Sequence, residues 1–330
     1  MDFSVLFNAL PGAVAQGLIW GIMAIGVYIT FKILDVADLT VDGTMCTGGA
    51  VCVVMMLSGQ NVWVSILCAV LAGLIAGLAT GLFNVCMGIP AILAGILTQI
   101  GLWSVNYMII GSANQVIRSN KYDVLVASKY VKHVPFFKNS ITVSAIFVIV
   151  IIALLYWVFG TALGCSLRAT GSNSKMSRAQ GINTNRNVVL GLMISNGLVA
   201  LSSALLSQYQ GFVDINMGRG AIVIGLAAVI IGTVIFERIF KNFALKLLSV
   251  ASGAVIYYVV LTIVIWMGID TNLLKLLQAL VVAVFLALPY WKKVYMPAIM
   301  SMKKRKAIRM HNKQVLAARK GDSSEDPAFS

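Results

Sequence analysis

The sequence predicts an all-α integral membrane protein with about nine transmembrane helices, within a range of eight to ten. The first observation is composition: 59% of the 330 residues are hydrophobic and only 11% are charged. A typical soluble domain is about 25% charged, and a folded soluble surface needs polar cover. A soluble enzyme, a disordered chain and a nucleic-acid-binding domain are therefore excluded. The second observation is the spacing of apolar stretches, and the third is the distribution of basic residues.

Nine apolar stretches are long enough, or nearly so, to cross a bilayer, which requires roughly 20 apolar residues per helix. The second and seventh are short, and each follows a polar segment that contains glycine. We therefore predict two short or broken helices, which membrane proteins tolerate where protein covers the backbone. The nine stretches span residues 10–31, 44–58, 62–85, 89–110, 141–159, 188–206, 220–236, 245–267 and 273–291.

Basic residues divide the chain into a transmembrane domain, residues 1–291, and a basic tail, residues 292–330. The tail holds ten of the 25 Lys and Arg residues and three of the 11 acidic ones, which places it in the cytoplasm. Counting the spans back from the tail places residues 160–187 in the cytoplasm, and the N-terminus and residues 207–219 on the external side of the membrane. Residues 111–140 also fall outside although they are basic, so either their charges have an external role or the span count is off by one. The tail either lies on anionic lipid or is a disordered topology determinant.

Two segments of the chain repeat one pattern. The first apolar stretch leads into residues 38–44, DLTVDGT, and the sixth leads into residues 214–220, DINMGRG; a short apolar helix follows each. In the topology above, the two units enter from opposite faces, which is the plan of inverted-repeat transporters. The alternative is that Asp and Gly only mark the ends of loops.

These two approach segments are the predicted path for a polar solute, because such a solute needs hydrogen-bonding groups in the bilayer core. Free N–H groups at helix N-termini favour anionic atoms such as a carboxylate. The alternative is that the polar residues cap helices and line no path. Polar residues inside other spans, such as Gln99, Asn106 and Asn196, more often join helices. The predicted path residues are Asp38, Thr40, Asp42, Thr44, Asn216 and Gly218.

The sequence contains no motif for enzymatic chemistry. It lacks a phosphate loop, a dinucleotide-binding motif and the common hydrolase motifs. Five cysteines without metal-ligand spacing and only two histidines predict no metal site and no bound cofactor. Charges are almost absent from the span interiors, which argues against an ion-coupled carrier. If ATP drives transport, the ATPase is a separate chain.

The polar connection at residues 164–183, GCSLRATGSNSKMSRAQGIN, is the most informative loop. Ser172 and Asn173 suit a helix N-cap, and Gly181 suits a C-cap. The helix between them has about two turns and is marginal alone, so we expect it to dock against a partner. The alternative is a solvated linker.

This loop resembles the cytoplasmic loop of ABC importer permeases of the branched-chain amino acid and ribose class. The similar residues are Arg168-Ala169-x-Gly171-x-Asn173 and Ala179-x-Gly181-Ile182-Asn183. The opening stretch, GLIWGIMAIGVYITFKILDVADLTVDGTMCTGGA, and residues 197–204 and 218–232 are also similar, so the resemblance covers about residues 10–290. Residues 38–43 resemble most closely the permeases that work with lipoprotein binding proteins of a tryptophan-type group.

The resemblance implies a permease subunit in the plasma membrane of a bacterium that imports an amino acid or a related, aromatic compound. It implies three partners: a second permease copy, a cytoplasmic ATPase that carries ATP and Mg, and an external substrate-binding lipoprotein. Membrane lipids surround the chain, and no nucleic acid is implied. The alternative function is a stand-alone secondary transporter or channel. The residues implied in coupling to the ATPase are Arg168, Ala169, Gly171, Asn173, Met176, Arg178, Ala179, Gly181 and Ile182.

Overall fold

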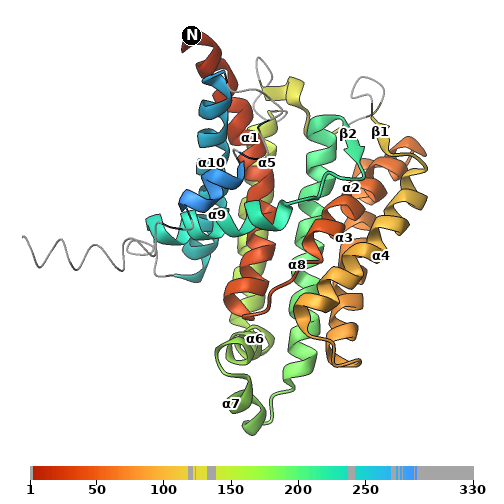
Figure 1. The fold of residues 1–330 in the computed structure, drawn as a ribbon, viewed down its shortest axis with the longest axis vertical. Coiled ribbons are helices and arrows are strands. Elements are labelled where there is room, and N and C mark those ends of the chain that lie inside the picture. The colour runs from red at the N-terminus through yellow and green to blue at the C-terminus, as the bar shows by residue number, and fades with distance from the viewer. Residues whose placement is uncertain are drawn as a thin grey trace, which may run out of the picture. The chain divides into compact units, whose positions relative to one another are not determined.

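The fold is a bundle of long apolar helices (Figure 1), seen here in a computed structural model. The structure describes residues 3–117, 122, 124–131, 139–236, 242–268, 273, 276, 278–285 and 287. Six helical segments in this part are long and apolar enough to cross a membrane. The all-helical, multi-pass prediction is therefore confirmed. The six segments are α1 (Phe3–Tyr28) with its π-helical extension η1 (Ile29–Ile33), α3 (Val62–Val85), α4 (Ala91–Ile110), α5 (Ser140–Gly160), α8 (Thr184–Gln210) and α10 (Phe243–Trp266).

Two apolar helices are shorter, as the sequence predicted: α2 (Val41–Leu57) and α9 (Ala221–Phe236). The remaining elements are small: β1 (Asn114–Val116), η2 (Ser128–Val131), α6 (Ala162–Ser172), α7 (Ser174–Ala179) and β2 (Phe212–Asp214). The tail at 292–330 lies outside the described residues, as do most of the basic residues at 118–138 and part of the ninth apolar stretch.

Helix α8 lies at the centre of the bundle and packs against α1, α2 and α3. Its pairing with α1 is antiparallel. The Ser195 hydroxyl donates to the Gly26 carbonyl at 2.8 Å, and at the other end the Tyr209 hydroxyl donates to the Gly12 carbonyl at 3.2 Å. The two helices that precede the short helices thus run in opposite directions, which an inverted repeat requires.

Glycines allow α3 to approach the backbone of α8. Gly73, Gly77 and Gly81 recur at every fourth position, a spacing that permits close helix contact, and the structure shows that contact. A Cβ atom on Gly73 would meet the Asn196 carbonyl oxygen at 2.5 Å, and one on Gly77 would overlap the backbone of Leu192.

We expect Gly77→Val to destabilise the bundle by about 1–3 kcal/mol, the usual range for overpacking. The added isopropyl group has no room against α8, so the helices must separate. Thermal unfolding of the purified protein measures the loss. The matched control is Gly101→Val on α4, where a Cβ meets nothing within 4 Å. Equal unfolding midpoints for the two variants would show that α3 and α8 do not pack through Gly77.

A two-stranded ribbon joins the connections at 111–140 and 207–219. Strands β1 and β2 pair antiparallel, with Asn114 opposite Asp214. The two connections therefore lie at the same end of the bundle. The sequence predicted two spans between these connections, and the structure has two, α5 and α8. Two crossings return the chain to the same end, so the prediction and the strand pairing agree.

Candidate functional site

The candidate site lies where the segments that precede α2 and α9 meet. In the first of these segments, Asp38 is 3% exposed and lies between η1 and α2. Its carboxylate accepts the Thr40 N–H at 2.9 Å and the Asn196 side-chain amide of α8 at 2.7 Å. The Thr44 hydroxyl donates to the other side of the same amide, at 2.7 Å. Asn196 thus joins α8 to the start of α2, in the helix-joining role that the sequence predicted.

A chain of hydroxyl groups continues from this segment into the neighbouring helices. The side-chain oxygen of Thr40 lies 2.7 Å from that of Thr80 on α3, which in turn donates to Thr98 on α4 at 2.9 Å. All three residues are buried. These contacts hold the start of α2 against α3 and α4.

Asp42 connects the two segments directly. It lies in the first turn of α2, and its carboxylate accepts the backbone N–H groups of Gly220 and Ile222, both at 2.9 Å. These donors belong to the N-terminus of α9, where the orphan N–H groups and the helix dipole favour a negative charge. The cap of α9 is therefore supplied by a residue of α2. Gly218 has no room for a side chain, because a Cβ would overlap the Asp42 carbonyl.

A cavity of about 320 Å³ opens beside this junction. It carries one carboxylate, one guanidinium, several uncharged polar groups and an indole ring, so it offers partners for both charges of a zwitterion and for an apolar group. The lining residues are Asp42, Gly43, Cys46, Gln99, Ile100, Trp103, Ser104, Asn106, Ile215 and Arg219.

The structure distributes the six predicted path residues over three environments. Asp42 lines the cavity, whereas Asp38, Thr40 and Thr44 belong to the buried hydrogen-bond network behind it. Asn216 is exposed and its N–H bonds to Asp214, and Gly218 packs on α2.

Sequence reasoning did not select the other polar lining residues as path residues. Gln99 and Asn106 were ranked below the path residues, as side chains that more often join helices, and Asn106 does donate to the Gly43 carbonyl at 3.2 Å. Arg219 could have been predicted from the sequence as a path residue, because it lies inside the second approach segment, residues 214–220. Trp103 could not have been predicted in this way, because α4 is apolar on many sides and the sequence does not show which side faces a cavity.

The loop at 160–187 forms two short helices. The predicted helix is confirmed as α7: the Asn173 side chain accepts the Met176 N–H at 3.0 Å, and Gly181 follows with a φ of 80°. Met176 is 63% exposed. Arg178 donates to the Thr184 hydroxyl at 2.7 Å, so part of its guanidinium is occupied within the chain.

The other predicted coupling residues fall into two groups: three are at least partly exposed, and two contact neighbouring helices of this chain. Ala169 and Ile182 are partly exposed, and Ala179 is exposed on α7. Gly171, on α6, packs on η1, because a Cβ there would overlap the Ile33 carbonyl. Arg168 turns toward α10: its guanidinium carbon lies 4.3 Å from the centre of the Phe243 ring.

Comparison with known proteins gives a family match and several relatives. The family described as branched-chain amino acid transport system / permease component matches residues 10–288. A tyrosine transport system permease protein from Clostridioides difficile (strain R20291) is 36% identical over 280 residues, which cover 85% of this chain and 91% of the relative.

Two further relatives are more distant. An uncharacterized protein from Rickettsia prowazekii (strain Madrid E) is 34% identical over 85% of this chain and 97% of its own length. The fructose import permease protein FruF from Bifidobacterium longum (strain NCC 2705) is 25% identical over 85% of this chain and 76% of its own length. No solved structure matches.

Proposed function

The chain belongs to the branched-chain amino acid transport permease family, and on that premise we propose that it imports an amino acid or a related compound of aromatic type. It is a permease component of an ABC-type transport system and not an enzyme. The observation that carries the substrate proposal is the cavity between α2, α4 and the start of α9. Asp42 and Arg219 present opposite charges there, and Trp103 presents an aromatic face. The tyrosine transport permease among its relatives supports the same substrate class.

In this proposal, the junction of α2 and α9 is the alternating-access element. Helix α1 with α2, and helix α8 with α9, are the two halves of an inverted repeat. The antiparallel contact of α1 and α8 supports this assignment. A substrate between α2 and α4 changes the surroundings of Asp42, and Asp42 holds α9, so binding and helix movement are linked through one side chain.

The energy comes from a cytoplasmic ATPase that binds ATP and Mg and docks on α7. The basic tail then lies in the cytoplasm and the N-terminus outside, in the plasma membrane of a bacterium. An external substrate-binding lipoprotein delivers the solute at the end that carries β1 and β2. A second copy of the chain completes the transporter through the apolar faces of α3, α4 and α5, where side chains such as Ile75, Met108 and Trp157 are more than 60% exposed.

The decisive test is uptake by the reconstituted complex. Proteoliposomes that contain the permease, its ATPase and its binding lipoprotein are expected to accumulate labelled tyrosine only when ATP is present. The alternative, a stand-alone secondary transporter or channel, predicts uptake by the purified chain without ATP or partners. That outcome would refute the proposal.

The cavity assignment is tested by Arg219→Gln. We expect the maximal uptake rate, at saturating liganded lipoprotein, to fall about tenfold, because one charge-assisted hydrogen bond contributes roughly that much. The matched control is Arg186→Gln in the first turn of α8, away from the cavity. Equal uptake rates for the two variants would exclude Arg219 from the substrate path.

A further inference from the structure

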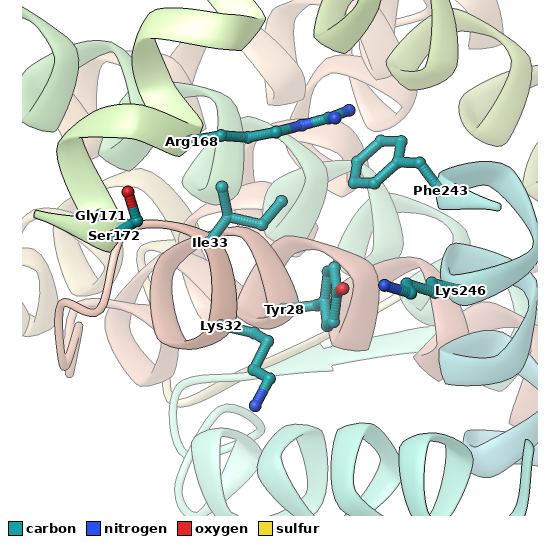
Figure 2. A pocket seen from close by; sticks show the side chains of 8 residues that line it. All are labelled: Tyr28, Lys32, Ile33, Arg168, Gly171, Ser172, Phe243 and Lys246. Atoms are coloured by element: carbon teal, nitrogen blue, oxygen red, sulfur yellow. The ribbon is translucent and has the colours of Figure 1, made fainter. Parts of the chain in front are cut away.

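A second cavity, of about 350 Å³, lies where η1, α6 and α10 meet (Figure 2). Its charged lining residues are all cationic: Lys32 from η1, Arg168 from α6 and Lys246 from α10. Tyr28 and Phe243 supply aromatic walls. Among the described residues, no carboxylate lines this cavity. A site with this chemistry attracts an anion.

The guanidinium of Arg168 is held in place by aromatic rings. Its central carbon lies 4.3 Å from the centre of the Phe243 ring and 5.6 Å from that of Phe159. Stacking of this kind is favourable by itself, and it leaves the N–H groups at the edge of the guanidinium free to bind an anion. Figure 2 shows Arg168 extending toward Phe243, and Lys246 pointing toward Tyr28 from the facing helix.

Among the residues that the structure describes, no acidic side chain lines the cavity, so the three cations have no counter-charge there. Lys32 lies at the exposed rim, and Figure 2 shows its ammonium pointing away from Arg168; its long, flexible stem would have to turn for the ammonium to reach an anion in the cavity. Gly171 packs against η1 and thereby fixes α6 beside Lys32.

The cavity lies at the level expected for lipid headgroups. Lys32 is at the end of the candidate span Ser4–Ile33, and Lys246 is in the first turn of the span Phe243–Trp266. Arg168 is on α6, which directly follows the span Ser140–Gly160. Three spans thus end around one basic cavity. Aromatic residues at such positions are typical of the membrane–water interface.

We propose that this cavity binds the phosphate group of an anionic phospholipid, with Arg168 and Lys246 on the phosphate and Lys32 at the rim. Arginine suits phosphate oxygens because it can donate two parallel hydrogen bonds. The same chemistry would accept free phosphate, but the position of the cavity at three span ends favours the lipid. The proposal requires only that the chain spans a bilayer, so it stands apart from the proposed transport function.

The test measures lipid binding to the full-length purified protein. The protein is stripped of lipid in detergent and titrated with phosphatidylglycerol, phosphatidylcholine or inorganic phosphate, and bound lipid is counted by native mass spectrometry. We expect retention of phosphatidylglycerol over phosphatidylcholine. The double variant Lys32→Gln/Lys246→Gln should weaken it roughly 30-fold, since each basic residue near a membrane surface contributes about fivefold.

The matched control is Lys175→Gln/Arg186→Gln, which removes the same charge from exposed positions outside this cavity. It should bind phosphatidylglycerol as the unmodified protein does. Equal weakening in the two double variants would overturn the site, because binding would then follow net charge alone. Displacement of phosphatidylglycerol by millimolar inorganic phosphate would overturn the lipid assignment in favour of a soluble ligand.

Discussion

Asp42→Ala is expected to lower the free energy of unfolding by about 2–3 kcal/mol and to abolish uptake. Hydrogen bonds to a charged group contribute about 1.5–3 kcal/mol, and loss of a helix cap costs about 1 kcal/mol. The carboxylate accepts two N–H groups of α9, at 2.9 Å each, and alanine leaves both without an acceptor. Thermal unfolding and ATP-driven uptake by the reconstituted complex measure the two losses.

Asp42→Asn removes the charge but keeps one acceptor oxygen. The two N–H groups of α9 bond to different oxygens of the Asp42 carboxylate, so asparagine can accept only one of them, and the unfolding midpoint should fall by less than with Asp42→Ala. Uptake should still fall, because the cavity loses its only carboxylate among the described lining residues. The matched control is Asp35→Asn, an exposed position with a φ of 55° that asparagine tolerates. If Asp42→Asn transported at the unmodified rate, Asp42 would be a helix cap and no part of the path.

The sequence allowed the helices to be predicted because each apolar stretch is long and bounded by polar residues. All eight stretches before residue 268 correspond to helices, and the short ones are α2 and α9. Helix α7 was predictable for a local reason: its cap, Asn173, and its terminating glycine, Gly181, lie within a few residues of it.

The junction of α2 and α9 could not be predicted in the same way. The hydrogen bonds of Asp42 reach residues almost 180 positions further along the chain. An aspartate before a glycine is ordinary at the start of a helix, so nothing local shows that it caps a different helix. Arg168 is a similar case, because nothing local in the loop shows that its guanidinium packs on Phe243 of α10.

Met176→Asp is expected to disrupt assembly with the ATPase without unfolding the permease. Met176 is 63% exposed on α7, and it contributes to the helix cap through its backbone N–H, which donates to the Asn173 side chain and is kept in the variant. If α7 docks on the ATPase as proposed, this exposed apolar residue within α7 has the character of an interface anchor, whose loss costs about 2 kcal/mol or more. A buried unpaired carboxylate adds a further penalty.

The measurement is co-purification of the ATPase subunit with the permease, and it should decrease by roughly 30-fold or more. Met176→Leu keeps the apolar contact and should retain the ATPase. Asn185→Asp adds the same charge nearby, in the first turn of α8 beside Arg178, and should also retain it. If Met176→Asp and Asn185→Asp weakened assembly equally, the effect would be electrostatic and would not identify α7 as the docking helix. Selective loss with Met176→Asp would assign the apolar face of α7 to the ATPase.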